Sequence, residues 1–153
     1  MRLKRVAFDH PDAVALRAQM VAEVSTMYTA ATPQQNRDGG AGVDPASVVM
    51  TAVGYDGDVP VAHVTVRRLA AGLEIKRMFI DPAYRGRGWA ALLLEAAEDA
   101  VQHAGDTRVL LHTGERQEAA IGLYTSRGYA PIDLYPPYLD VPKSLCFAKD
   151  LSA

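Results

Sequence analysis

The sequence predicts an α/β domain, and three observations lead to that prediction. Strand-like runs separated by turn residues fill positions 48–80. From Gly88 to Ala104 the apolar residues then recur at the spacing of a helix rather than at the period of two that is typical of strands. A short apolar run, Val109–Thr113, follows that helix. Strand, helix and strand in this order predict a right-handed crossover that makes the two strands parallel.

Composition and charge narrow the class of protein. The chain has 153 residues, of which 49% are hydrophobic and 22% charged, and it fits one domain over residues 1–153. A net charge of −2 argues against nucleic acid as a partner, because such binding needs a basic face. No apolar run approaches the ~20 residues of a membrane span. One cysteine and four scattered histidines predict neither a disulfide nor a metal site, so we expect a cytoplasmic protein without a membrane partner.

The N-terminal part is predicted to form a strand, a helix and a loop. The strand is expected at Lys4–Phe8, and Pro11 between two aspartates indicates the start of a helix. Its apolar residues at spacings of three and four predict a buried face made of Val14, Ala18, Val21, Val24 and Tyr28. The stretch Thr32–Pro45, rich in Gly, Pro and Asn, predicts a mobile loop.

A β-meander and a second α/β portion follow. Val48–Tyr55 and Val59–Arg67 are joined by a hairpin signal, and Leu73–Ile80 ends at Asp81-Pro82, because proline has no amide to donate to the ladder. Beyond the crossover helix, which Gly105 is expected to end, the pattern predicts these further elements: a strand at Val109–Thr113, a helix at Gln117–Ser126 and a final strand at Ser144–Leu151.

The candidate binding segment is Arg85-Gly86-Arg87-Gly88-Trp89-Ala90, at the start of the long helix. Glycines let a ligand approach the main chain, and the first amides of a helix have no partner within it. Together with the helix dipole and two arginines, they form a site suited to a pyrophosphate. The alternative is a glycine-rich loop that only turns a corner, with solvated arginines.

Two other phosphate-binding motifs fit less well. A P-loop would need Lys and then Ser or Thr after the last glycine, but Trp89 and Ala90 stand there. A dinucleotide fingerprint follows its strand almost at once and is completed by an acidic residue at the end of the next strand. Here Asp81–Arg85 intervenes, and the next strand ends in His112-Thr113.

These residues resemble the GNAT superfamily of acyl-CoA-dependent N-acetyltransferases. The family signature is Arg or Gln, two residues, Gly, one residue, then Gly or Ala, and Arg85, Gly88 and Ala90 match it. Ile75–Pro82 resembles the family's fourth strand and following loop, and Ala120–Tyr129 its later helix and turn. The resemblance implies a mixed sheet of about seven strands flanked by helices, with two parallel strands splayed in the middle to bind coenzyme A.

The resemblance also implies roles for particular residues. Main-chain groups of Met78, Phe79 and Ile80 would bind the pantetheine arm, and one of these amides would polarise the thioester carbonyl. Tyr124 would protonate or hydrogen-bond the leaving thiolate, although an aromatic core residue is the alternative. Gln117 stands where the family often has asparagine, and a glutamine can still offer an amide to the pantetheine or to a backbone group.

Glu74 is the candidate base, because it precedes Arg85 by the spacing of a glutamate that several family members use to deprotonate the acceptor. An amine must lose a proton before it attacks a carbonyl. A salt bridge with a neighbour such as Lys76, on the same strand face, is an equally weighted alternative. We expect His63 and His112 to be core or cleft residues, and Cys146 to be a core residue rather than an acyl-carrying nucleophile. The Tyr- and Pro-rich segment 129–142 could shape the acceptor pocket, form an ordinary loop or make a dimer contact.

The function hypothesis is acetyl transfer from acetyl-CoA to a primary amine of a small molecule, by direct attack through a tetrahedral intermediate. A peptide or protein N-terminus is the alternative acceptor. A non-catalytic acyl-CoA sensor is the alternative class, and it would bind the cofactor without turnover. A homodimer is compatible with each hypothesis, and the sequence does not decide it.

Overall fold

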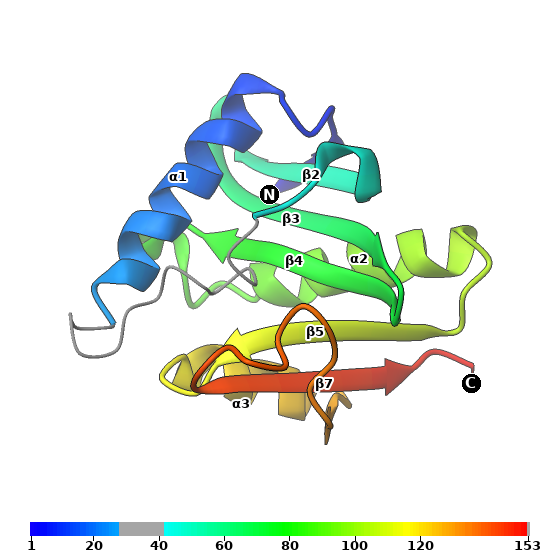
Figure 1. The fold of residues 1–153 in the computed structure, drawn as a ribbon. Helices are drawn as coiled ribbons and strands as arrows, with labels where there is room; N and C mark the ends of the chain where they lie inside the picture. Colours follow the sequence, from blue (N-terminus) through cyan, green and yellow to red (C-terminus); the bar gives the residue numbers. More distant parts are fainter. Residues whose placement is uncertain (28–41, 153) are drawn as a thin grey trace.

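A computed structural model describes residues 1–27 and 42–152 (Figure 1). Within these ranges the chain forms seven strands and three α-helices. The strands are β1 (Arg2–Arg5), β2 (Val48–Asp56), β3 (Val59–Leu69), β4 (Gly72–Ile80), β5 (Arg108–Gly114), β6 (Ala130–Ile132) and β7 (Ser144–Asp150), and the helices are α1 (Pro11–Ser25), α2 (Trp89–His103) and α3 (Glu118–Ser126).

All seven strands belong to one mixed sheet in the order β1-β2-β3-β4-β5-β7-β6. The pair β4 and β5 is parallel, and the other neighbouring pairs are antiparallel. The chain passes from β4 to β5 through α2, so the predicted crossover is confirmed. The predicted α/β class with about seven strands is confirmed as well.

The two parallel strands separate along their length. They pair at three positions, from Leu73 opposite Val109 to Ile75 opposite Leu111. Yet β4 continues to Ile80 and β5 to Gly114. Beyond Ile75 each strand therefore loses its partner on that side, which opens the middle of the sheet at the carboxyl end of β4. This is the splay that the family resemblance led us to expect.

The helices divide between the two faces of the sheet (Figure 1). α2 and α3 lie on one face, where Leu93 and Val101 join Leu73, Ile75 and Val109 in the main core. α1 lies on the opposite face, where Ala13 and Leu16 pack against β2 and β4. The segment between β6 and β7 covers the same face farther along, over β5 and β7, with Tyr135 and Tyr138 as its buried anchors.

Two predictions for the N-terminal part are wrong. The first strand is Arg2–Arg5 rather than Lys4–Phe8, because its register with β2 begins at Arg2 opposite Tyr55 and ends at Arg5. Phe8 instead lies beneath the guanidinium of Arg17, 3.7 Å from the ring centroid.

The buried face of α1 also differs from the prediction. Val14 is 48% exposed and Ala18 is exposed, whereas Ala13 and Leu16 are buried with Val24. The predicted stripe and the buried one both have helical spacing and share Val24, so the period of the apolar residues alone could not choose between them. The exposed residues of the predicted stripe, Val14 and Ala18, are small and tolerate contact with water. Tyr28 and most of the predicted loop, residues 32–41, lie outside the described residues.

Candidate active site

A pocket of about 580 Å³ opens where the end of β4 meets α1, the start of α2 and the start of α3. This volume is typical of sites for small molecules and cofactors, roughly 300–1,000 Å³. Ten residues were predicted to bind the cofactor, and nine of them line the pocket: Met78, Phe79, Ile80, Arg85, Gly86, Gly88, Trp89, Ala90 and Gln117. The tenth, Arg87, is not among the lining residues.

The loop before α2 has the backbone that its glycines predict. Gly86 and Gly88 have φ of +80° and +78°, and a Cβ at either position would meet no atom within 4 Å. Gly88 is the N-cap of α2, and no side chain caps the helix there. The amides of the first turn, at Trp89 and Ala90, are thus available to an anion, which the dipole of the helix also favours.

Arg85 connects this loop to two other elements. Its Nε donates to the carbonyl oxygen of Ile80 at 2.9 Å. Its Nη2 donates to both carboxylate oxygens of Glu23 in α1, at 2.7 and 2.9 Å. Glu23 also lines the pocket, so in this structure it supplies the negative charge that Arg85 attracts. Both side chains are partly exposed, which lets a competing anion reach the pair.

Arg87 lies over aromatic rings instead of facing the pocket. Its guanidinium is 5.1 Å from the ring centroid of Tyr84 and 5.2 Å from that of Trp89. The two rings are stacked, with centroids 6.0 Å apart. Tyr84 and Trp89 themselves line the pocket, so Arg87 supports its wall from outside and adds positive charge nearby.

A β-bulge reverses the side-chain alternation at the tip of β4. Lys76 pairs with Thr65 and Phe79 with His63, so Arg77 and Met78 lie opposite a single residue of β3. Arg77 has φ of +56°, in the left-handed region that few residues other than glycine adopt. Met78 and Ile80 consequently pack on the α2 face, and Phe79 packs against α1. All three line the pocket, which therefore draws its wall from both faces of the sheet.

Tyr124 lies in α3 beside the pocket, on the α2 face of the sheet. It is 7% exposed and its ring packs against Tyr129 and Phe147. Ala120 and Leu123 of the same helix line the pocket. Among the described residues no group hydrogen-bonds the Tyr124 hydroxyl, and burial raises its pKa to about 12. The phenol therefore keeps its proton at neutral pH and can donate it.

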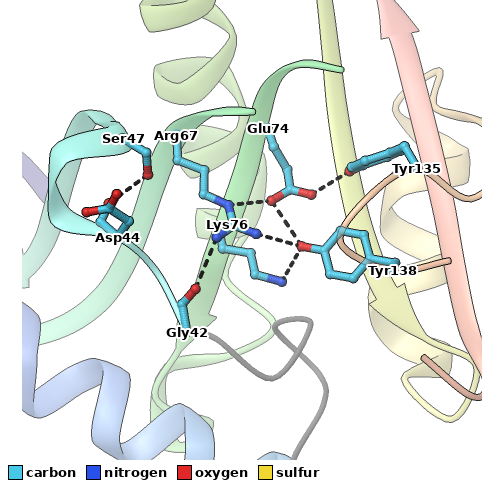
Figure 2. Close-up of polar contacts among 8 residues, drawn as sticks. All are labelled: Gly42, Asp44, Ser47, Arg67, Glu74, Lys76, Tyr135 and Tyr138. Atoms are coloured by element: carbon cyan, nitrogen blue, oxygen red, sulfur yellow. Dashed lines mark hydrogen bonds and ion pairs between the residues drawn. The ribbon is translucent and has the colours of Figure 1, made fainter. Parts of the chain in front are cut away.

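Glu74 lies on the opposite face of β4, in the buried polar network of Figure 2. Its side chain is fully buried and accepts a hydrogen bond from Arg67 Nε at 2.9 Å. The hydroxyls of Tyr135 and Tyr138 donate to the same carboxylate, at 2.5 and 3.1 Å. The bond with Arg67 is an ion pair that joins neighbouring strands, because Arg67 is the register partner of Glu74 on β3.

Tyr138 occupies the position where β4 and β5 separate. Its ring stacks on His112 of β5, with centroids 3.7 Å apart and planes at 4°. The ammonium of Lys76 on β4 lies 4.8 Å from the same ring, and donates to the Tyr138 hydroxyl at 2.8 Å. Arg67 also donates to that hydroxyl, at 2.9 Å. One fully buried tyrosine therefore connects both splayed strands on the α1 face.

Sequence reasoning missed a whole wall of the pocket. α1 contributes Met20, Glu23 and Val24, and Met27 just after the helix also lines the pocket. An amphipathic pattern gives no signal that a helix lines a site. Arg116, just before α3, also lines the pocket and donates to the carbonyl of Met27 at 3.2 Å. A single arginine in a loop belongs to no recognisable sequence motif, so the sequence offered no reason to select Arg116.

His63 and Cys146 are core residues, as expected, and His63 is fully buried. His112 is half-buried and hydrogen-bonds Ser144 at 2.8 Å. Cys146 is a buried free thiol, and burial raises its pKa. In the described ranges no helix is long and apolar enough to cross a membrane.

Comparisons with known proteins agree with this geometry. A model of the acetyltransferase (GNAT) family matches residues 17–129. The chain is 41% identical over 78 residues to an IAA acetyltransferase of Azospirillum brasilense, a match that covers 51% of each chain. It is 36% identical over 88 residues to an uncharacterized protein of Mycobacterium leprae, covering 58% of this chain and 23% of that protein. The chain therefore spans about half the first relative and a quarter of the second.

Solved structures share the fold over nearly the whole chain. A protein of Klebsiella pneumoniae described as an acyl-CoA N-acyltransferase has a TM-score of 0.79 at 27% identity, over 98% of this chain and 97% of that one. The PaiA N-acetyltransferase of Thermoplasma acidophilum, solved with coenzyme A, has a TM-score of 0.70 at 12% identity, over 98% and 99%. With the family model matching most of its length, this chain belongs to the GNAT family of acetyltransferases.

Proposed function

We propose that this protein transfers an acetyl group from acetyl-CoA to the primary amine of a small molecule, by direct attack of the amine through a tetrahedral intermediate. The observation that carries the proposal is the pocket at the end of β4, which is lined by nine of the ten residues expected to bind the cofactor. The name of the Azospirillum relative, an IAA acetyltransferase, supports a small-molecule acceptor.

The pocket fits coenzyme A in two respects. Its loop combines uncapped amides at the start of α2 with Arg85, which suits the diphosphate. The unpaired edge of β4 offers main-chain groups of Met78, Phe79 and Ile80 to the pantetheine arm. When bound, acetyl-CoA supplies the activated acetyl thioester. Gln117, the N-cap of α3, makes no capping hydrogen bond with its side chain, so its amide is available to the same arm.

Tyr124 is proposed as the proton donor to the leaving thiolate. Its hydroxyl has no hydrogen-bond partner in the described part of the chain, and its pKa of about 12 keeps it protonated at neutral pH. Its side chain packs on the same face of β4 as Met78, one of the residues whose backbone would hold the pantetheine. A free thiolate in a buried site is unstable, so a nearby phenol lowers the barrier to its departure.

Glu74 is proposed as the base, acting through Tyr135. An amine cannot reach the carboxylate directly, because the Glu74 side chain has 0% exposure. Tyr135 is slightly exposed and already donates its proton to Glu74. As the amine gives a proton to the Tyr135 oxygen, the tyrosine passes its own proton to Glu74. Burial and the Glu74 charge raise the pKa of Tyr135, so no free phenolate forms and both transfers occur together.

The first experiment measures release of free CoA thiol from acetyl-CoA with polyamines, amino acids, aminoglycosides and short peptides. Turnover with one small-molecule class, slowed strongly in Tyr124→Phe, is the expected result. Turnover only with peptides would replace the acceptor by a protein N-terminus. Tight binding of acetyl-CoA without turnover on any acceptor would indicate the sensor, and absence of binding would contradict the proposal altogether.

A second experiment separates the relay from the stability of the network. Tyr135→Phe keeps the Arg67–Glu74 ion pair and removes only the donated proton. Tyr55→Phe is its control, because Tyr55 donates to Asp12 at 2.6 Å and is equally buried, on a strand that pairs with neither β4 nor β5. We expect a loss of kcat on the order of 100-fold for Tyr135→Phe and little change for Tyr55→Phe. Equal effects in the two variants would rule out the relay.

A further inference from the structure

The bulge in β4 has a buried support that no motif of the family describes. His63, on β3, is fully buried and its Nδ1 lies 2.7 Å from the carbonyl oxygen of Arg77. Arg77 is the residue with φ of +56°, at which β4 changes the direction of its side chains. The imidazole is thus in contact with the peptide group that immediately precedes the amide of Met78.

The contacts of His63 determine where its proton lies. A carbonyl oxygen only accepts, so the hydrogen on this bond belongs to Nδ1. Nε2 then has a lone pair, and it lies 3.0 Å from Nη1 of Arg17, which only donates. Arg17 extends from α1 toward His63, and its Nη2 donates to the carbonyl oxygen of Phe8, which precedes the helix. The ring is therefore the neutral Nδ1–H tautomer, held between a cation and a carbonyl.

The charges around the ring keep it neutral. Burial is the main cause that lowers the pKa of His63 to about 4; the bond to Arg77 opposes this shift and the positive charge of Arg17 adds to it. Desolvation likewise lowers the pKa of Arg17, and the charge of Asp9 raises it. A protonated ring would direct its second N–H against the guanidinium, so the arrangement is stable only with neutral imidazole.

The position of this contact connects it to the pocket. A residue other than glycine is strained at positive φ, and such strain persists only where neighbouring groups hold it. If Arg77 relaxed to an extended conformation, the tip of β4 would change its alternation, and Met78 and Ile80 would no longer line the pocket beside α3. The hydrogen bond from His63 is made to the carbonyl of the strained residue itself.

We propose that His63 is a positioning residue for acetyl transfer: its Nδ1–H, oriented by Arg17, fixes the Arg77 carbonyl and so positions the amides of the Met78–Ile80 segment that face the gap between β4 and β5 for binding acetyl-CoA. The inference rests on the proposed function, because it assigns those amides to acetyl-CoA. It adds a part of the site that lies outside the pocket and comes from α1 and β3. Misplacing an oxyanion donor by about 1 Å costs on the order of 100-fold in rate.

The test compares two pairs of variants at a temperature where all remain folded. His63→Asn places an amide donor near the position of Nδ1, whereas His63→Leu removes the donor. We expect His63→Leu to lower kcat roughly 10- to 100-fold and to weaken acetyl-CoA binding, measured by calorimetry, roughly three- to tenfold. His63→Asn should recover most of both losses. A purely structural role would lower the melting temperature in both variants and leave kcat and affinity of the folded protein unchanged.

The second pair tests the strain at the bulge. In the His63→Leu background, Arg77→Gly and Arg77→Ala both remove the same side chain, but only glycine adopts positive φ without cost. Arg77→Gly should restore acetyl-CoA affinity, and Arg77→Ala should not. Equal affinities in these two double variants would overturn the proposed link between the hydrogen bond and the backbone.

A measurement without turnover keeps the inference separate from the proposed function. Nitrogen-15 NMR of the imidazole should show a neutral Nδ1–H ring at pH 7 with no change down to pH 5. The Nε2–H tautomer, or a ring that titrates near pH 6.5, would overturn the inference. If the wild-type protein bound acetyl-CoA but acetylated no acceptor, the proposed function would fail, while the tautomer and the calorimetric series would still decide the role of His63.

Discussion

Replacing Gly88 should separate cofactor binding from stability, because a second glycine at the other end of α2 provides a matched control. Gly88 precedes the helix with φ of +78°, and Gly105 follows it with φ of +87°. At both positions an added Cβ meets no atom within 4 Å. Alanine at either site therefore introduces the same backbone strain and no clash with the protein.

The expected cost in stability follows from that strain alone. A left-handed residue other than glycine costs roughly 1–2 kcal/mol. For a chain of this size such a loss lowers the melting temperature by about 2–8 °C. Gly88→Ala and Gly105→Ala should lie in this range together, as measured by differential scanning calorimetry in the absence of ligand.

Only the variants at Gly88 should affect the cofactor. A side chain there stands over the uncapped amides of α2, where the diphosphate is proposed to bind. We expect Gly88→Ala to weaken acetyl-CoA at least tenfold, which corresponds to about 1.4 kcal/mol, and Gly88→Leu to abolish binding in calorimetric titration. A folded Gly88→Leu variant with unchanged affinity, or an equal loss in Gly105→Ala, would refute the placement of the diphosphate at this loop.

Three further predictions concern the buried groups. Tyr124→Phe should lower kcat roughly 100-fold with little change in the KM for acetyl-CoA; because the pKa of Tyr124 is about 12, the steady-state pH profile should show no loss of its proton between pH 8 and 10. Glu74→Gln should lower the free energy of unfolding by about 3–5 kcal/mol in urea titrations, since Arg67 keeps a buried charge without its counterion. Glu98→Gln, at the more exposed pair with Lys149, should lower it clearly less, and similar losses would contradict the importance of burial. The native pKa values of about 4 for His63 and about 2 for His112 lie below the ordinary 6.5, so the unfolded chain binds protons first as the pH falls. The free energy of unfolding, full above pH 6.5, should therefore fall by roughly 2–3 kcal/mol per pH unit below it. Urea titrations at pH 7 and 5.5 test this, and equal stability at the two pH values would contradict it.

The sequence predicted those parts of the fold that depend on local chemistry. Gly86 and Gly88, which alternate with two arginines, indicated an anion-binding turn that needs a left-handed backbone, and both glycines have positive φ. The turn residues between strand-like runs likewise indicated the meander of β2, β3 and β4. The exposed Val14 shows where this reasoning fails: two helical stripes were present, and the choice between them depends on contacts with strands far away in sequence.

The candidate site was predictable where a motif marked it and not where distant residues meet. Glu74 could be named from its spacing to Arg85, but its burial beneath Tyr135 and Tyr138 depends on a segment that follows some sixty residues later. Nothing in the sequence indicated that Glu23 or His63 takes part in the site. Their roles arise from α1 and β3 meeting the tip of β4, which a periodic pattern does not encode.

The reversal of alternation at Arg77 has a consequence for comparing and redesigning such chains. A substitution scheme that assumes strict alternation along β4 would place Phe79 on the wrong side of the sheet, and would treat Met78 as a partner of Lys76. Deleting Arg77 would restore regular pairing with β3 and keep Met78 and Phe79 on their present faces, because Phe79 would still pair with His63. Straightening the strand with all its residues present would instead turn its end over and exchange the wall of the pocket for the surface under α1. In this strand, the number of residues is as restrictive as their identity.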